Sequence, residues 1–225
     1  ASVYLDNAST TRPLREVVDA MSNAMQTSAN ASSAHSGGAA ARNILAASRS
    51  SIAHLCSANP EAVIFTSGGT ESNSLVLLND DVAVGGAIEQ VITTRVEHSS
   101  ILDACTRLQE RGVRVIYLDV DSDGLINLED MQSLHIDSKT LVSIQWVNNE
   151  TGVIQPIRQI ADLVHDFGGI MHTDASQALG KMDINFSSLP IDLMTCTAHK
   201  IHGPQGVGAI LIRDGVRLKS LLAGG

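Results

Sequence analysis

The chain has 225 residues, of which 44% are hydrophobic and 17% charged, a composition that predicts a globular protein with a sizeable core. Its formal net charge of −9 argues against nucleic-acid partners, which need lysine and arginine contacts to phosphates. No apolar run reaches the roughly 20 residues of a membrane-spanning helix, and the first residues lack the regions of a signal peptide, so we expect no membrane association and a cytoplasmic location.

The first sixty residues carry two helical patterns, at 14–25 and 38–55, which flank a run of small residues at 28–38. We expect this run to be a loop, either a flexible connector or a substrate-facing segment. Short β-branched runs then alternate with helical patterns. The expected strands lie at 62–66, 90–94, 113–117, 141–146, 169–173, 191–196 and 207–212, and the expected crossover helices at 99–111 and 157–167. This alternation predicts an α/β fold with a mostly parallel sheet flanked by helices.

A turn of small residues at 67–72 follows the expected strand at 62–66 and opens a helical pattern. Backbone N–H groups at a helix N-terminus attract anions, so this turn is a candidate for a phosphate cradle. The turn matches neither a P-loop nor a dinucleotide fingerprint. The alternative is a tight structural turn in which Thr70 caps the helix.

Two charged residues follow later strands. A period of two places His172 and Asp174 on one face, with Asp174 at the carboxyl end of its strand, where open α/β sheets bind ligands. A carboxylate there can pair with a pyridine nitrogen; a helix cap or half of a metal pair is the alternative. Lys200 follows the strand at 191–196 among small and polar residues. Burial would lower the pKa of its amine and favour imine formation, whereas a surface charge is the alternative.

Polar residues also follow two other strands. His98 comes after the strand at 90–94 and Asn149 after the strand at 141–146. A histidine can lie on an aromatic ring or move protons, and an asparagine can donate to a phenolic oxygen, although each residue alone is explained as well by a loop or a cap. His98 and Asn149, together with Thr70, Asp174 and Lys200, give five strand ends a polar or charged side chain. This coincidence predicts one site.

The order of these motifs resembles the class V aminotransferase superfamily of fold-type I pyridoxal-phosphate enzymes, and most closely the cysteine desulfurases. The resemblance extends from the Tyr-Leu-Asp-Asn-Ala-Ser-Thr-Thr segment at 4–11 to the Thr-Ala-His-Lys segment at 197–200, which is the most specific motif. It implies that residues 1–225 form an N-terminal arm plus most of the large domain that binds pyridoxal phosphate. The C-terminal small domain of the family is then absent from this chain.

The resemblance also implies roles for the matching positions. Lys200 is expected to form the Schiff base with pyridoxal 5'-phosphate, and Lys200 or His98 to move the Cα proton. His98 would stack on the pyridine ring and Asp174 would bind its nitrogen. The other implied contacts of the cofactor or the substrate are Gly69, Thr70, Asn149, Gln177, Thr197 and His199. Thr197 stands where a serine is usual, and Ala31 where a proline is common.

The implied reaction converts L-cysteine to L-alanine and passes the sulfur to an enzyme cysteine, for iron–sulfur clusters or other sulfur compounds. The implied partners are L-cysteine, a second copy in a homodimer, a sulfur acceptor or iron–sulfur scaffold protein, and a second chain that carries the C-terminal part; no metal is implied. None of Cys56, Cys105 and Cys196 lies in a sulfur-accepting motif, so we expect this chain alone to be inactive in sulfur transfer. The alternatives are a selenocysteine lyase, another class V aminotransferase, or a non-catalytic fragment with this fold.

Overall fold

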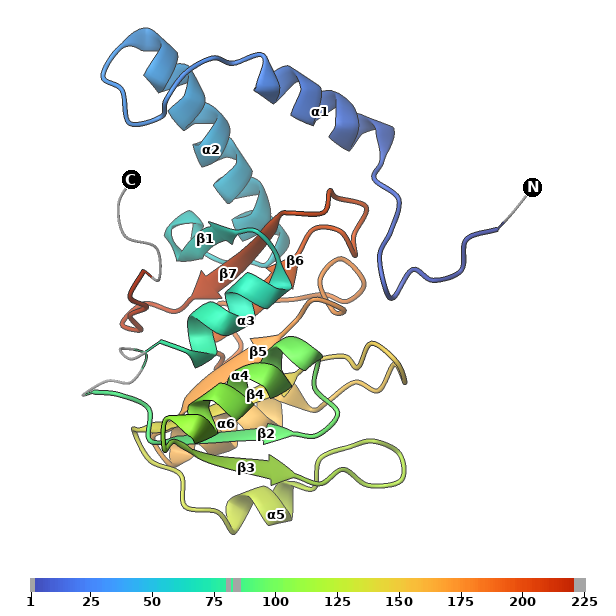
Figure 1. Ribbon diagram of the computed structural model, residues 1–225, viewed down its shortest axis with the longest axis vertical. Helices are drawn as coiled ribbons and strands as arrows, with labels where there is room; N and C mark the ends of the chain where they lie inside the picture. Colours follow the sequence, from blue (N-terminus) through green and yellow to red (C-terminus); the bar gives the residue numbers. More distant parts are fainter. Residues whose placement is uncertain (1–2, 80–81, 83–85, 221–225) are drawn as a thin grey trace.

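The computed structural model describes residues 3–79, 82 and 86–220, which form one seven-stranded sheet with helices on both faces (Figure 1). The strand order is β1-β7-β6-β5-β4-β2-β3, and β7 is the strand that runs antiparallel to its neighbours. The strands are β1 (Val63–Thr66), β2 (Gln90–Thr94), β3 (Arg114–Leu118), β4 (Thr140–Gln145), β5 (Ile170–Asp174), β6 (Leu193–Thr197) and β7 (Gly208–Ile212). The mostly parallel α/β architecture expected from the alternating patterns is confirmed.

The described residues form six α-helices. They are α1 (Arg15–Met25), α2 (Ser36–Leu55), α3 (Gly69–Leu77), α4 (Ser99–Glu110), α5 (Leu128–Gln132) and α6 (Ile157–Asp166), with a short 3₁₀ turn at Pro60–Ala62. Leu77 of α3 and Ile101 of α4 belong to one hydrophobic cluster, whereas Ile160 of α6 belongs to the other. The sheet therefore separates two cores, as expected for parallel strands buried on both faces.

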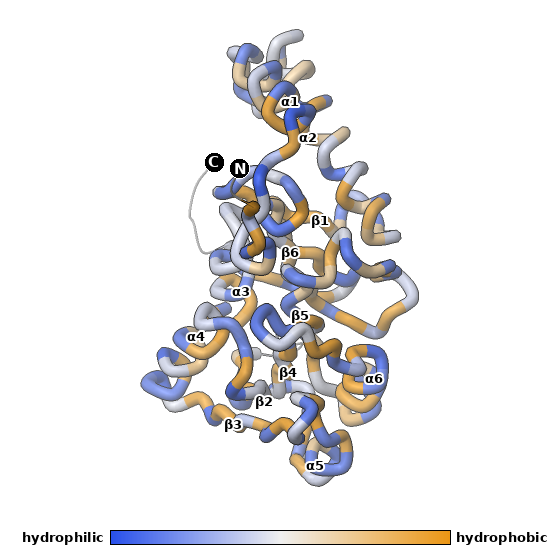
Figure 2. Tube along the Cα trace, turned by 90° about the vertical axis from the view of Figure 1, so that its right-hand side faces the viewer, coloured by the Kyte–Doolittle hydropathy of each residue, from blue (hydrophilic) through white to orange (hydrophobic). Residues whose placement is uncertain are grey.

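The two N-terminal helices stand apart from this layered body. Figures 1 and 2 show α1 and α2 extending beyond the end of the sheet that carries β1. No residue of α1 is buried, although its sequence is strongly amphipathic, and α2 buries Gly38 and Ala53. Among the described residues, no helix is both long enough and apolar enough to cross a bilayer.

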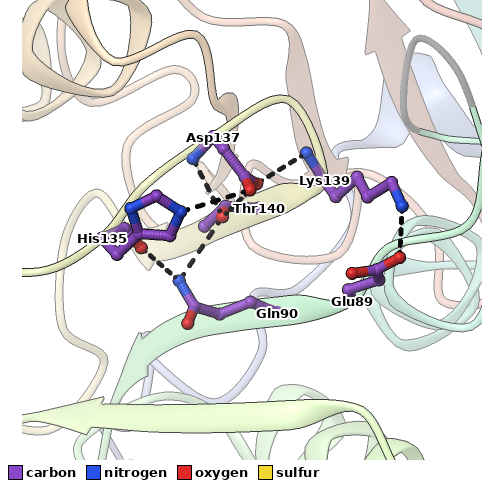
Figure 3. Close-up of polar contacts among 6 residues, drawn as sticks. All are labelled: Glu89, Gln90, His135, Asp137, Lys139 and Thr140. Carbon is purple, nitrogen blue, oxygen red and sulfur yellow. Dashed lines mark hydrogen bonds and ion pairs between the residues drawn. The ribbon is translucent and has the colours of Figure 1, made fainter.

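A polar cluster fixes the amino ends of β2 and β4, at the opposite edge of the sheet from the strand ends that were expected to carry chemistry (Figure 3). Its members are Glu89, Gln90, His135, Asp137, Lys139 and Thr140. Nε2 of Gln90 donates to the carbonyl oxygen of His135 over 2.7 Å, and Oγ1 of Thr140 donates to Asp137 over 3.0 Å. Gln90 pairs in register with Thr140. Because a shift of one residue would turn each side chain of β2 to the opposite face of the sheet, these contacts help to fix which face each side chain occupies.

Local expectations differ from the structure in three places. The helix α5 was not expected, because five residues are too few to display a helical period. The helix α2 begins at Ser36, so the end of the expected loop at 28–38 is helical. The residue that caps α3 is Gly68, with φ of 155°, and Thr70 lies in the first turn, so the alternative that Thr70 is the cap is wrong.

Gly208, the first residue of β7, lies where two backbones come into close contact. A Cβ atom added there would lie 2.6 Å from Cα of Gly68 and 2.9 Å from the carbonyl oxygen of Cys196. Replacing Gly208 with alanine is therefore expected to displace β7 or the turn before α3 and to lower the free energy of unfolding by roughly 1–3 kcal/mol. Urea denaturation measures this loss.

A matched control is Gly37→Ala, since Gly37 lies in α2 and the atoms nearest to its added Cβ belong to side chains of His35 and Ala29. Alanine is favoured over glycine in a helix, whereas the added Cβ would lie 3.2 Å from the His35 ring that caps α2, so we expect a smaller loss of stability than at Gly208. Equal unfolding midpoints for Gly208→Ala and the unaltered protein would show that the close approach is not required.

Candidate functional site

The carboxyl edge of the sheet contains a cavity of about 310 Å³ that brings the expected residues together. Its lining includes Gly69, Thr70, His98, Asn149, Asp174, Gln177, Thr197, His199 and Lys200. All nine candidates thus line one cavity, although they come from segments spread over most of the sequence. The parallel direction of β1, β2, β4, β5 and β6 places the segments that follow these strands at the same edge.

Asp174 is the last residue of β5 and its carboxylate is held by two donors. Oδ1 accepts from the backbone N–H of Ser176 over 2.9 Å, and Oδ2 accepts from Nδ2 of Asn73 over 2.8 Å. The residue is 8% exposed. Two hydrogen bonds to a buried carboxylate fix its orientation toward the cavity that it lines.

Lys200 is half-buried in the loop between β6 and β7. Burial lowers the pKa of its amine; the negative charge of Asp174 opposes this effect and the positive charge of Lys181 adds to it. A lowered pKa leaves more of the amine uncharged near neutrality, which is the form that attacks a carbonyl or accepts a proton.

The N-terminal arm (residues 3–14) holds the loop of Lys200 in place. The backbone N–H and the hydroxyl of Thr11 both donate to the carbonyl oxygen of His199, over 2.7 and 2.8 Å. Oγ1 of Thr11 accepts from the backbone N–H of His202 over 2.7 Å. These bonds involve His199 and His202, on either side of Lys200 in the sequence, so the arm holds the lysine loop in place.

One end of the cavity has the features of an anion site. Gly69 and Thr70 form the first turn of α3, whose N-terminus carries backbone N–H groups and the positive end of the helix dipole. Oγ1 of Thr197 is buried and has no hydrogen-bond partner among the described residues. Burial, and then the charge of Lys200, lower the pKa of His199, so its ring is held neutral while Nδ1 contacts the hydroxyl of Thr10 over 3.1 Å. A buried hydroxyl without a partner, at a helix N-terminus, fits a bound phosphate oxygen.

His98 precedes α4 and caps it. Its Nδ1 accepts from the backbone N–H of Ser100 over 3.2 Å and lies 2.8 Å from the hydroxyl oxygen of the same serine. The sequence indicated a loop or cap as one explanation of His98, and the structure combines this cap with a place in the cavity wall. The helix end therefore sets the orientation of the imidazole ring.

Asn149 and Gln177 line the cavity from two loops. Oδ1 of Asn148, the neighbour of Asn149, accepts from the N–H groups of Glu150 and Thr151 over 2.9 and 2.8 Å, which shapes the turn that presents Asn149. Nε2 of Gln177 donates to the carbonyl oxygen of Ala8 over 2.7 Å, and its Oε1 accepts from Lys181 over 2.6 Å. The amide of Gln177 thus joins the cavity to the N-terminal arm.

Sequence reasoning assigned no role to three polar residues that support this cavity, namely Asn73, Glu97 and Ser100, although the Glu97–His98 pair was expected at this edge. Asn73 and Ser100 lie inside α3 and α4, where a polar residue carries no strand-end signal, and both line the cavity. Glu97 is buried; its oxygens accept from the hydroxyl of Thr94 over 2.8 Å and from the backbone N–H of Gln145 over 2.9 Å. Burial, with a smaller contribution from the charge of Asp174, raises the pKa of Glu97 to about 8.

His172 shares a face of β5 with Asp174, as its spacing predicted, but it is a core residue. Its ring nitrogens lie 2.8 Å from Oγ of Ser143 and 3.0 Å from Oγ1 of Thr195, and the residue is fully buried. Burial lowers the pKa of His172 to about 4, so the ring is neutral. Within the described part of the chain, no group of three or more His, Cys, Asp or Glu residues is arranged to hold a metal ion.

The fold and the cavity define a class of protein. A lysine loop, an aspartate and a helix N-terminus meet at the carboxyl edge of a mostly parallel sheet, and the family model described as "Aminotransferase class-V" matches residues 3–225. The chain therefore belongs to the class V aminotransferase family.

Within this family the chain is similar to cysteine desulfurases. It is 40% identical over 224 residues to cysteine desulfurase 2 of Trichormus variabilis, and 40% identical over 227 residues to cysteine desulfurase IscS of Ehrlichia chaffeensis. These alignments cover 99% of this chain but 56% and 55% of the two relatives. The chain thus spans just over half the length of the curated relatives that it matches.

Solved structures give the same result. A NifS-like protein superimposes with a TM-score of 0.94 at 35% identity, covering all of this chain and 62% of that one. SspA, solved in complex with cysteine, superimposes with a TM-score of 0.92 at 33% identity, covering all of this chain and 65% of that one. The expected resemblance to class V aminotransferases and to cysteine desulfurases is confirmed.

Proposed function

We propose that the protein is a pyridoxal-phosphate-dependent cysteine desulfurase, and that residues 1–225 form its N-terminal arm and most of its cofactor-binding large domain. The observation that carries the proposal is the single cavity in which the amine of Lys200, the carboxylate of Asp174 and the N-terminus of α3 meet. The names of its relatives support the substrate, L-cysteine.

The residues of the cavity fit pyridoxal phosphate. The buried, unpartnered hydroxyl of Thr197 lies beside the first turn of α3, where a phosphate oxygen would give it a partner. In this assignment Gly69, Thr70, Thr197 and His199 hold the phosphate, and Asp174 pairs with the pyridine nitrogen. His98 covers the face of the ring, while Asn149 and Gln177 contact its phenolic oxygen or the substrate.

Lys200 moves the proton in this assignment. When bound, pyridoxal phosphate supplies an aldehyde that condenses with amines and a ring that takes up the electron pair of a Cα–H bond. Because burial lowers the pKa of Lys200, its Nζ atom is available to accept the Cα proton near neutral pH. Asp174, fixed by its two donors, would present its carboxylate to the ring nitrogen.

The sulfur-accepting thiol lies outside the cysteines of this chain. Cys56, Cys105 and Cys196 are all buried, with exposed fractions of 0%, 0% and 2%. Burial, and then the charge of Glu97, raise the pKa of Cys105 to about 12, and contact with Cys56 and burial raise that of Cys196. Contact with Cys196 lowers the pKa of Cys56, but this thiol is fully buried. Since the acceptor must be an accessible thiolate, these residues are poor sulfur acceptors. The thiol then comes from another segment or chain, and we assign the homodimer and an iron–sulfur scaffold as further partners.

Exchange of the Cα proton in deuterated water tests the proposal without requiring the acceptor thiol. The protein is incubated with pyridoxal phosphate and one amino acid at a time, and deuterium at Cα is followed by proton NMR. We expect exchange to be fastest for L-cysteine, and L-alanine to accumulate only when a competent thiol is supplied.

The other outcomes separate the alternatives. Faster exchange with alanine or aspartate would indicate an aminotransferase, and faster exchange with selenocysteine a selenocysteine lyase. Cofactor binding without any exchange would identify a non-catalytic member of the family.

A further inference from the structure

A chain of hydrogen bonds links the two residues assigned to the ring of the cofactor. Nδ1 of His98 lies 2.8 Å from Oγ of Ser100, and Oγ of Ser100 accepts from Nδ2 of Asn73 over 2.9 Å. The same Nδ2 atom donates to Oδ2 of Asp174 over 2.8 Å. Asn73 therefore lies between His98 and Asp174, and it directs one amide proton to Ser100 and the other to Asp174.

The groups at the two ends of this series of hydrogen bonds determine which atom donates in each bond. The backbone N–H of Ser100 can only donate, so Nδ1 of His98, 3.2 Å away, presents a lone pair. The hydroxyl of Ser100 accepts the proton of Asn73 and turns its own proton toward the same Nδ1 atom. The proton of a neutral His98 ring then lies on Nε2.

The orientation of the Asn73 amide follows from Asp174. A carboxylate oxygen accepts hydrogen bonds, so the atom of Asn73 that faces it is the nitrogen rather than the oxygen. Oδ1 of Asn73 is buried and has no hydrogen-bond partner among the described residues, and the residue is 1% exposed. An unsatisfied buried oxygen destabilises the folded state. Stability of α3 alone therefore does not explain an asparagine here.

We propose that Asn73 is a positioning residue that, through Ser100, holds His98 with its ring proton on Nε2 and, directly, holds the carboxylate of Asp174. The proposal rests on the proposed function for what these two residues do. Its consequence is a division of labour: His98 covers the ring and donates from Nε2, and the Cα proton goes to Lys200.

Nitrogen NMR of histidine side chains tests the proposal. The full chain is labelled with ¹⁵N-histidine, and the signals of His98 are identified by their loss in His98→Gln. In the unaltered protein we expect the signal of an unprotonated nitrogen at Nδ1 and of a protonated one at Nε2. In Asn73→Ala we expect both signals to move toward each other, because Oγ of Ser100 becomes free to accept a proton from Nδ1.

Two further variants make the result decisive. Ser100→Ala removes the hydroxyl that donates to Nδ1 but keeps the backbone N–H of residue 100, so the ring proton should stay on Nε2 while the Nδ1 signal moves away from the Nε2 signal. Ser72→Ala is the matched control, since Ser72 is a buried neighbour on α3 whose hydroxyl contacts Thr66 over 2.8 Å. It should leave the His98 signals unchanged.

The proposal is wrong if Nδ1 carries the proton in the unaltered protein. It is also wrong if Ser100→Ala leaves the His98 signals in place. This outcome decides the matter even if Asn73→Ala does not fold. Because the spectra are recorded without pyridoxal phosphate, this outcome is separate from a failure of the cofactor or exchange tests.

Discussion

Replacement of Lys200 by alanine is expected to abolish covalent attachment of pyridoxal phosphate. It should also slow Cα exchange of L-cysteine by roughly a hundredfold to ten-thousandfold, which is the usual contribution of a positioned acid or base. The reason is that this amine serves both as the attachment point and as the proton acceptor. The measurement is intact mass after borohydride reduction, together with the exchange rate. Only the unaltered protein should gain the mass of the reduced cofactor.

Lys181→Ala is the matched control for this change. Lys181 is near enough to Lys200 for its charge to lower the pKa of that amine, and its Nζ atom contacts Gln177. We expect Lys181→Ala to retain the attached cofactor and to shift the pH profile of exchange upward, because the pKa of Lys200 rises when the neighbouring charge is lost. Attachment that persists in Lys200→Ala and disappears in Lys181→Ala would reassign the reactive amine.

Replacement of Glu97 by glutamine is expected to remove a pH dependence of stability. The pKa of Glu97 is about 8 in the folded protein, chiefly because of burial, against 4.5 for an ordinary glutamate. Between these two values the folded state holds a proton that the unfolded state has released. The free energy of unfolding therefore falls as pH rises from 4.5 to about 8 and changes no further above that. At full effect this decline amounts to roughly 3–5 kcal/mol.

The measurement is the difference in unfolding free energy between the unaltered protein and Glu97→Gln, obtained by urea denaturation across that pH range. The glutamine oxygen can still accept from the backbone N–H of Gln145, so the difference reports the proton rather than a lost contact. Glu89→Gln is the control, because Glu89 forms an exposed ion pair with Lys139 and such pairs contribute at most about 1 kcal/mol. Parallel curves for Glu97→Gln and the unaltered protein would mean that Glu97 is charged when folded.

The sequence was sufficient for the part of the site that follows from strand direction. Residues such as Asp174 and Lys200 come directly after apolar strands, and the carboxyl ends of parallel strands share one edge, so their convergence was predictable. Their roles toward the cofactor remain predictions. Asn73 could not be predicted in the same way, since a polar residue inside a helix is ambiguous until the packing shows that its amide faces Asp174. The burial of Glu97 is likewise a product of tertiary packing around a loop residue.

The antiparallel insertion of β7 has a consequence for the order in which the protein assembles. Among the described strands, β1 pairs with β7 alone, Val63 opposite Leu211, and β7 in turn pairs with β6. The segment between Thr66 and Gly208 must close into a loop before these two strands can pair. Closing so long a loop carries a large entropic cost and is characteristically slow. During synthesis, β1 therefore has no partner strand until β7 has left the ribosome, although the turn at Gly69 already contacts Thr195 and Thr197 of β6. Pairing of β1 is thus expected to follow assembly of the parallel strands.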